Sequence, residues 1–453
     1  MRAAPIAVVA FALYTAIGIV RYDIGRSGNY DLGIFAQGAQ RWSQGRLPGS
    51  AIRGLGTLFA DHFSPITVLF GAAWAVWSDP RALIVTQALA LAAAVFVLGV
   101  ASFRRLPPVP ATVLVVFAAL AKGAVSAAVF DVHETGLAAP VMAGLCYGLL
   151  ERRRTLTMTC ALALLLGKED LGLTVAVAGL IWWRLAGDRR TGLLLIAAGL
   201  VGAALAFAVV LWANPEHTSP YLQFLTGASG NAQGLPGTGV TGGHRWEPAL
   251  LFAATAGIVG LRSPIAALAL PTLTWRVLSS NPAYWQTYFH YDVLLVPIAA
   301  FALLDILSRP GVAGTRAVVV RSVGLTAMAI AAGLGVVKAA AWPLLDPSGY
   351  RPSARLQAAA ALGRLVPPGE AVAAQQELGP VLIARLDVRM LSTLPAGPVR
   401  WVILTPAGSS LGAPEAAKRA WLQQQQTRPG VETSSQDGVL LLHLPAPAVV
   451  RLT

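Results

Sequence analysis

The sequence is poor in charged residues and in cysteine. Only 12% of its 453 residues are charged and 55% are hydrophobic, whereas soluble globular proteins carry about 25% charged residues. The apolar residues form repeated runs of roughly 15 to 25, which are typical of membrane spans. Cys146 and Cys160 are the only cysteines, and both lie in apolar runs without metal-binding spacing. The composition predicts a polytopic membrane protein and indicates neither a cysteine metal site nor a disulfide.

Several catalytic and nucleotide-binding motifs are also missing. The sequence has no GxxxxGKS/T phosphate loop, no GxSxG elbow, no HExxH zinc motif and no GxGxxG turn between a strand and a helix. These absences remove support for ATP-driven transport and for zinc proteolysis. The net charge is +13, but the basic residues cluster in short loops, as the positive-inside rule requires. We therefore expect no nucleic-acid partner.

The apolar runs predict an all-α polytopic membrane bundle of about eleven transmembrane helices. The first run, about residues 4 to 21, follows Arg2 and has no small-x-small cleavage site, so we expect a retained helix with a cytoplasmic N-terminus. Residues 65–78 are too short for a span and predict an interfacial helix. The other spans are expected at about residues 81–103, 109–128, 136–150, 155–167, 171–186, 191–212, 249–261, 264–278, 290–307 and 317–340.

The composition changes after Trp342, which divides the chain into two expected domains. Residues 1–341 form the predicted membrane domain, and residues 342–453 have the polar spacing of a small α/β domain. Residues 351–369 predict an amphipathic helix closed by Pro-Pro-Gly. Short strands are expected at residues 370–375, 401–406 and 439–445. Because the last span exits on the outer side, this domain is expected to be extracytoplasmic.

The first external loop, residues 22–64, holds Asp31 and Asp61, with His62 beside the second acid. An acid beside a bilayer can serve as a general base or hold a cation, and a neighbouring acid or histidine can tune its pKa. These residues are our candidate catalytic groups. The alternative is helix capping, because Asp is a favoured N-cap residue and each acid precedes an apolar, helix-like run.

Three further polar groups interrupt the apolar runs. Lys168, Glu169 and Asp170 follow an expected helix of only about 13 residues, roughly 20 Å long, so they should lie below the outer membrane surface, where charges are costly and usually pair or serve a site. Lys168 could also simply neutralise one acid. The candidate substrate-binding residues are completed by two clusters at helix junctions, His133 with Glu134 and Tyr288 with His290 and Tyr291, whose aromatics could also be an interface belt.

Five motifs in one order resemble those of a bacterial family of predicted membrane proteins classed as a domain of unknown function. They are YDLGIFAQ at residues 30–37, DHFSP at 61–65, DVHE at 131–134, GKED at 167–170 and FHYD at 289–292. The resemblance extends into the tail, through VAAQQELGPVLIAR at residues 372–385. This family in turn resembles the GT-C membrane glycosyltransferases, in which a catalytic acid lies on the first external loop.

The resemblance implies sugar transfer from a polyprenyl-phosphate donor that enters from the membrane lipid, with the acceptor outside the cytoplasm and its identity open. Asp31 would be the general base, Lys168 or Arg53 would hold the donor phosphate, and His62 or His133 would orient it. A divalent cation is a possible cofactor. The implied location is the cytoplasmic membrane of a bacterium, with a role in the cell envelope.

Two other functions fit the same sequence. A transporter or flippase would use Lys168, Glu169 and Asp170 as a coupling site, and inverted repeats would favour it. A non-catalytic envelope assembly or sensing protein would use residues 342–453 as its working part. The latter predicts that Asp31 can be replaced without loss of function, whereas the tail cannot.

Overall fold

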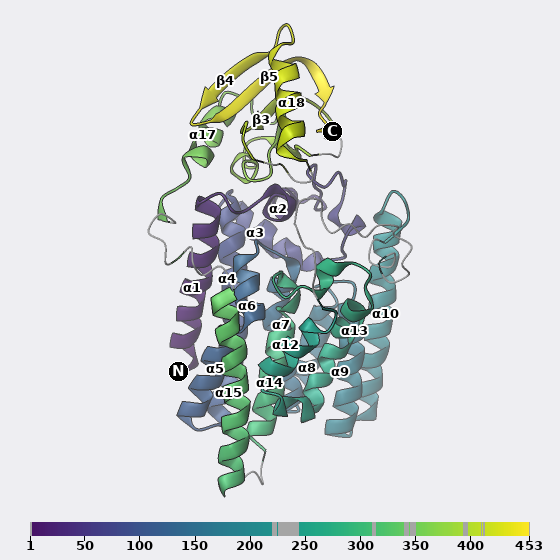
Figure 1. Ribbon diagram of the computed structural model, residues 1–453. Helices are drawn as coiled ribbons and strands as arrows, with labels where there is room; N and C mark the ends of the chain where they lie inside the picture. Colours follow the sequence, from purple (N-terminus) through teal and green to yellow (C-terminus); the bar gives the residue numbers. More distant parts are fainter. Residues whose placement is uncertain are drawn as a thin grey trace.

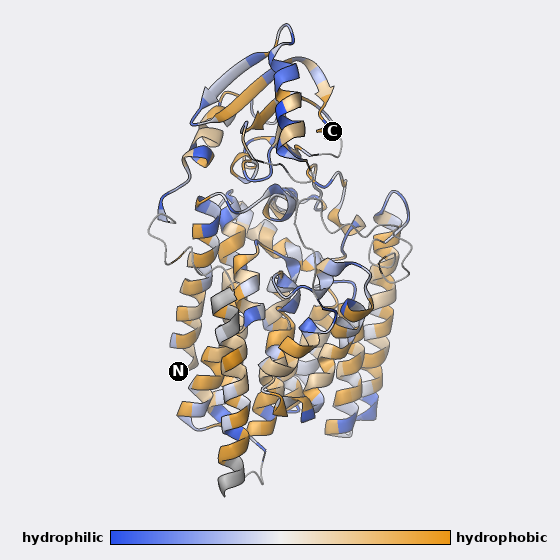
Figure 2. Cartoon of the chain, in the orientation of Figure 1, coloured by the Kyte–Doolittle hydropathy of each residue, from blue (hydrophilic) through white to orange (hydrophobic). Residues whose placement is uncertain are grey.

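The chain folds into a helical body and a small α/β domain that sits on one end of it (Figure 1). The computed structural model describes residues 2–219, 224, 244–309, 314–338, 344, 350–392, 397–408, 410 and 413–452. The body is dominated by apolar side chains, and the α/β domain mixes polar and apolar ones (Figure 2). The predicted domain boundary at residue 342 lies outside the described residues, as does most of the Gly-rich stretch 214–247 between the expected spans at 191–212 and 249–261.

The helical body contains the long apolar helices that the sequence predicts. Five described stretches are long and apolar enough to cross a membrane, namely Ala3–Asp23, Pro80–Arg105, Pro108–Val129, Arg189–Ala213 and His290–Leu307. The shorter α7 (Glu134–Leu150), α8 (Arg154–Leu164) and α9 (Leu171–Ala186) match expected helices, and α15 spans Gly314–Lys338. The count of eleven spans therefore stays a prediction, while a mainly helical body with several apolar helices is confirmed.

Several expected helices are broken in the structure. Residues 109–128 form α5 (Pro108–Ala119) and α6 (Lys122–Val129), because the backbone is extended at Ala121. Three later expected helices, at 249–261, 264–278 and 290–307, each combine a short 3-10 turn with an α-helix. These pieces are α12 (Glu247–Thr255) with Val259–Arg262, Pro264–Ala269 with α13 (Leu270–Leu278), and His290–Asp292 with α14 (Leu295–Leu307).

The basic ends of several helices lie together at one end of the body. Arg105, at the end of α4 (Pro80–Arg105), pairs with Glu151 at 2.8 Å and donates a hydrogen bond to the Ser308 hydroxyl at 3.4 Å. Glu151 and Ser308 are the C-terminal caps of α7 and α14. The C-terminal ends of α4, α7 and α14 therefore lie side by side. This agrees with the charge pattern, which predicts that the three helices run in the same direction.

Residues 22–64, which the sequence predicts to be the first external loop, are partly helical. A π-helical turn (Asn29–Gly33) leads into α2 (Ile34–Ser43), and two 3-10 turns, Leu58–Ala60 and Pro65–Thr67, precede α3 (Val68–Val76). The segment therefore folds against the end of the body instead of forming an open loop. The expected interfacial helix at residues 65–78 corresponds to the second 3-10 turn and the short α3.

The C-terminal domain is a five-stranded sheet with a helix on each face. Its strand order is β2-β1-β3-β5-β4, in which β1 (Ala371–Ala374), β2 (Asp387–Met390) and β3 (Pro398–Leu404) are parallel. The antiparallel strands are β4 (Glu432–Gln436) and β5 (Val439–Val449). The buried apolar side chains of α17 (Ala354–Gly363) and α18 (Glu415–Gln426) belong to two separate cores. The predicted helix and three strands are present, whereas β2, β4 and α18 were not predicted.

The C-terminal domain and the segment 22–64 share one hydrophobic core. Leu32 and Ile34 are buried together with Leu378, Leu382 and Ile383 of the C-terminal domain. The backbone amide of Ser353 also donates to the carbonyl of Asp23, at the end of α1 (Ala3–Asp23), at 2.8 Å. The α/β domain is therefore held on the same end of the body as the Asn29–Gly33 turn, with α2 below the sheet (Figure 1).

Candidate functional site

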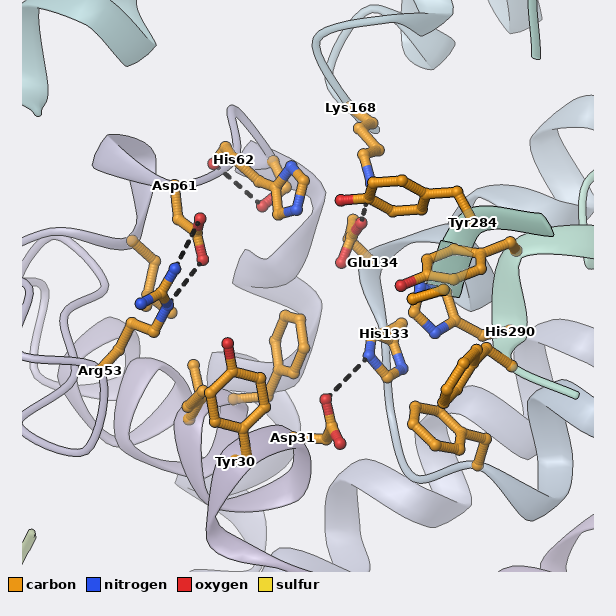
Figure 3. A pocket seen from close by; sticks show the side chains of 18 of the residues that line it. Tyr30, Asp31, Arg53, Asp61, His62, His133, Glu134, Lys168, Tyr284 and His290 are labelled. Atoms are coloured by element: carbon orange, nitrogen blue, oxygen red, sulfur yellow. Dashed lines mark hydrogen bonds and ion pairs between the residues drawn. The ribbon is translucent and has the colours of Figure 1, made fainter. Parts of the chain in front are cut away.

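A cavity of about 210 Å³ lies at this end of the body. Its lining comes mainly from the segment 22–64, the start of α7, the α8–α9 connection and the segment before α14. Most of the predicted site residues line it, namely Asp31, Arg53, Asp61, His62, His133, Glu134, Lys168, His290 and Tyr291. The side chains that are labelled in Figure 3 extend into the cavity from opposite walls. Groups up to about 260 positions apart in sequence are thus brought into one site.

Asp31 lies inside the π-helical turn and points at His133. Its Oδ1 atom is 3.5 Å from His133 Nε2, and its side chain is 23% exposed. The residues at the N-cap positions of the turn and of α2 are Gly28 and Gly33, so Asp31 is not the helix cap that the alternative interpretation expects. Single π-helical turns occur often at functional sites. The backbone here directs one carboxylate into the cavity.

An aromatic and imidazole wall stands opposite Asp31. The rings of His133 and His290 are stacked, with centroids 3.4 Å apart and an interplanar angle of 16°. Phe130 stacks on both rings at 5.7 Å and 5.9 Å. Packing of this kind limits the rotation of His133, which fixes the direction of its Nε2 atom toward Asp31.

Asp61 is paired with a guanidinium on the same segment. Arg53 donates from Nε to Asp61 Oδ2 at 3.2 Å and from a terminal nitrogen to Oδ1 at 3.3 Å, a bidentate arrangement. Burial disfavours the Asp61 carboxylate, but His62 and Arg53 together hold its pKa below the usual range. Asp61 is therefore ionised at neutral pH, and its charge is balanced by its neighbours.

His62 is held by a second carboxylate. Its Nδ1 atom lies 2.8 Å from Glu169 Oε1, and the backbone amide of Phe63 donates to Glu169 Oε2 at 3.1 Å. Burial and the nearby Lys168 ammonium disfavour protonation of His62, but the ion pair with Glu169 outweighs them and raises the pKa of His62. The result is a histidine that is protonated more readily than usual at the cavity wall.

The His62–Glu169 pair predicts a pH-dependent stability. Because the folded-state pKa of His62 is raised, the pair contributes fully below about pH 6.5, the ordinary histidine value, and its contribution is lost as pH rises through the raised pKa. We expect the thermal stability of the wild type to fall between about pH 6 and about pH 9 more than that of His62→Gln. Thermal unfolding in detergent at several pH values measures this difference, and parallel curves would contradict it.

Lys168 lies among carboxylates in the cavity wall. Its Nζ atom is 3.4 Å from Glu134 Oε1, and both side chains are less than one tenth exposed. Burial disfavours the ammonium form, but Glu134, Glu169 and Asp170 raise the pKa of Lys168. The lysine therefore stays charged. Lys168 and Glu169 are buried and paired in this geometry, whereas Asp170 is half-buried.

Three predicted residues lie outside the cavity lining. Glu169 supports His62 from behind, and Asp170 accepts a hydrogen bond from the Trp275 indole at 3.1 Å. Tyr288 is 46% exposed and packs edge-on against Phe130. The structure thus separates residues that face the cavity from residues that hold or flank them.

Sequence reasoning missed several lining and supporting residues. Tyr30 and Tyr284 line the cavity, although aromatics beside a predicted membrane surface carry no specific signal. Arg276 is fully buried; it pairs with Asp292 at 2.6 Å and donates to the backbone carbonyls of Tyr284 and Gln286. It anchors the segment that brings Tyr284 and His290 to the cavity. An arginine inside an apolar run was the available sequence signal.

The described residues offer no ligand set for the divalent cation that the resemblance gives as a possible cofactor. Within the part of the chain that the structure describes, no three His, Cys, Asp or Glu residues are grouped so that they could hold a metal ion. Two of the cavity carboxylates are instead directed at cations of the chain itself, Asp61 at Arg53 and Glu134 at Lys168.

The sequence profile of one protein family, described as "Predicted membrane protein (DUF2079)", matches residues 26–441. The chain belongs to this family. The match begins just before the Asn29–Gly33 turn and ends within β5, so it includes both the cavity and the C-terminal domain. A search of curated proteins gives no match.

The fold is similar to that of solved GT-C glycosyltransferases. ArnT from Cupriavidus metallidurans bound to undecaprenyl phosphate is 13% identical, with a TM-score of 0.54 and 97% of each chain covered. The apo state of the same enzyme gives a TM-score of 0.51 at 15% identity, covering 95% of this chain and 97% of that one. Arabinofuranosyltransferase AftD from Mycobacteria gives 0.50 at 16% identity, covering 96% of this chain but 41% of AftD. The predicted GT-C-like fold is therefore confirmed.

Proposed function

We propose that this protein is a membrane glycosyltransferase that transfers a sugar from a polyprenyl-phosphate donor to an acceptor on the extracytoplasmic face of a bacterial cytoplasmic membrane. The observation that carries the proposal is one cavity lined by Asp31, Arg53 and Lys168, a carboxylate and two cations. A GT-C-like fold supports it, and one solved structure of that fold has undecaprenyl phosphate bound. A lipid-linked donor also needs no nucleotide-binding domain, in keeping with the missing nucleotide motifs.

Asp31 is the proposed general base. The cavity carboxylates Asp61 and Glu134 each face a guanidinium or an ammonium, whereas Asp31 faces the His133 imidazole. Asp31 is therefore the carboxylate of these three that is not held by a guanidinium or an ammonium, which suits it to contact an acceptor hydroxyl. Asp31 would accept the proton of the acceptor hydroxyl as the hydroxyl oxygen attacks the anomeric carbon of the donor.

Arg53 and Lys168 are the proposed phosphate-binding groups. In this reaction the bond between the anomeric carbon and the phosphate oxygen breaks, and the phosphate leaves with the electron pair. Cations beside the leaving oxygen stabilise the charge that develops there. Protonated His62, which adjoins Asp61 in the cavity lining, would orient the phosphate. Tyr30 and Tyr284 offer ring faces to a sugar.

The location of the charges supports a transferase over a transporter. The lining residues lie at helix ends and in connecting segments, and the C-terminal domain contacts the segment that carries Asp31. A coupling site for transport is expected near the membrane midplane, between repeats of the fold. A cavity at one end of the body suits an acceptor that arrives from one aqueous side.

Binding of undecaprenyl phosphate tests the proposal. We expect Arg53→Gln to raise its Kd by about tenfold, because a charge-assisted contact to phosphate is lost. Arg154→Gln is the matched control, since Arg154 also faces an aspartate, Asp188, but lies outside the cavity. Microscale thermophoresis of the purified full chain in detergent measures both. Equal affinities in the two variants would remove Arg53 from the phosphate site.

A further inference from the structure

The C-terminal sheet has the topology of a ligand-binding α/β domain. Strand β1 has β2 on one side and β3 on the other, and all three are parallel. In open α/β sheets, ligands bind outside the carboxyl ends of the strands at the point where the strand order reverses. Here that point lies between the ends of β1 and β3, where Gln375 and Thr405 follow the strands.

A segment of the same chain occupies this position. The side-chain amide of Asn29 donates to the carbonyls of Ala374 and Gln375 at 3.2 Å and 3.4 Å. The backbone amide of Asn29 donates to the Gln376 carbonyl at 2.8 Å, and that of Tyr30 donates to Gln376 Oε1 at 3.2 Å. The residues that these hydrogen bonds join are about 345 positions apart in sequence. The ligand of the sheet is therefore the turn that carries Asp31.

The C-terminal domain and the turn that carries Asp31 lie so close together that there is no room for a side chain at Gly379 or Gly28. A Cβ atom on Gly379 would lie 1.7 Å from Asn29 Oδ1, and one on Gly28 would lie 2.3 Å from Gln376 Nε2. Gly379 has φ −68° and ψ −40°, a conformation open to any residue. Glycine is therefore required at 379 by the approach of Asn29 and not by the backbone.

A buried polar network fixes the edge of the sheet that contacts Asn29. Gln375 Oε1 accepts hydrogen bonds from the Thr405 backbone amide at 2.9 Å, the Thr405 hydroxyl at 3.1 Å and Lys418 Nζ at 3.1 Å. Lys418 is fully buried and also donates to the Ala407 carbonyl at 2.9 Å. With its side chain held in this way, Gln375 presents its own backbone carbonyl to Asn29 in one orientation.

The opposite side of the turn is held by the helical body. The amide of Gly28 donates to Asp131 Oδ2 at 3.2 Å, and Asp131 Oδ1 faces Arg21 Nε at 3.6 Å. The turn itself is closed by the wide bonds from the Gly33 amide to the Gly28 carbonyl, at 3.1 Å, and from the Ile34 amide to the Asn29 carbonyl. Since π-helical turns are rare and poorly favoured in isolation, contacts from both sides are needed to keep this one.

We propose that the C-terminal domain is the positioning element for the Asp31 carboxylate, with Asn29, Gln376 and Gly379 as positioning residues. The sheet uses its ligand-binding edge to hold the Asn29–Gly33 turn, and this sets where Asp31 stands relative to His133. A site held by a rigid scaffold keeps its geometry better than a free loop does. The role of this contact in catalysis rests on the proposed function, whereas the positioning of the turn by the C-terminal domain does not.

Hydrogen exchange of the full chain in lipid nanodiscs tests the inference without any substrate. In Gly379→Ala we expect the amides of residues 29–33 to exchange about tenfold faster, as for the loss of one or two hydrogen bonds, while the amides of β1, β3 and β5 keep their protection. Gln376→Ala is a second variant that adds no atoms and should act in the same direction. Gln424→Ala, an exposed substitution on α18, is the matched control.

Unchanged protection of residues 29–33 in both Gly379→Ala and Gln376→Ala would overturn the inference, whatever the activity of the protein. Faster exchange in these variants supports it even where no sugar transfer is found, in which case only the proposed function fails. Where transfer is measured, the same two variants are expected to lower kcat and to leave the KM for the donor unchanged, because Asn29 and Gln376 do not line the cavity.

Discussion

Replacing Asp31 with asparagine is expected to lower the kcat of sugar transfer by about a hundredfold to ten-thousandfold, the range that general base catalysis supplies. Asparagine keeps the size of the side chain and can still contact His133 Nε2, which lies 3.5 Å away in the wild type. It cannot accept the proton of an acceptor hydroxyl. The KM for the donor should change little, because the proposed phosphate-binding groups, Arg53 and Lys168, are untouched.

The assay for Asp31→Asn is release of polyprenyl phosphate from a panel of polyprenyl-phosphate sugars, followed by mass spectrometry in proteoliposomes. Asp437→Asn is the matched control, since Asp437 is exposed in a turn with φ +47°, a conformation that asparagine tolerates. Full activity of Asp31→Asn would exclude Asp31 as the base. Absence of transfer in the wild type as well as in the variant would instead favour the non-catalytic assembly or sensing protein, for which Asp31 is dispensable.

Replacing Arg276 with methionine is expected to have the largest effect on stability. Arg276 is fully buried, and its loss leaves the Asp292 carboxylate, which is 4% exposed, without its guanidinium. Breaking a buried ion pair on one side costs about 3–5 kcal/mol. Two backbone carbonyls, those of Tyr284 and Gln286, also lose their donor. Unfolding by SDS titration in mixed micelles measures the change.

Two further variants give the Arg276 prediction its controls. Arg276→Met combined with Asp292→Leu should regain part of the lost stability, because no unpaired charge remains buried. Arg309→Met removes an exposed partner of Asp305, on the next helix, and should change the unfolding free energy by no more than about 1 kcal/mol. A stability loss of equal size in Arg276→Met and Arg309→Met would contradict the anchoring role of Arg276.

The long helices could be predicted because their apolar runs are long enough to need no tertiary information. The break between α5 and α6 could not, since Leu120 and Ala121 carry no helix-breaking signal. That break arises from packing, because α6 begins beside the segment before α14, and a Cβ on Gly123 would lie 2.7 Å from the Asp292 carbonyl oxygen. Tertiary contacts override local propensity here.

The charged part of the site could be predicted because ionisable groups are rare in an apolar chain and costly there. Asp31, Glu134 and Lys168 are therefore evident from their residue types and their places among the apolar runs. Tyr30 and Tyr284 are not, because tyrosine is common at membrane surfaces. The contact between Asn29 and Gln376 could not be predicted from the sequence either, because no periodicity links two segments about 345 residues apart.

The most direct test of the central claim is a structure of the full chain with undecaprenyl phosphate bound. The account predicts the phosphate inside the cavity, within hydrogen-bonding distance of Arg53 or Lys168, with the Asp31 carboxylate facing the position where the anomeric carbon of a donor sugar would be. A phosphate bound outside this cavity, or a cavity closed to the lipid, would contradict the account and remove the basis for assigning sugar transfer to this site.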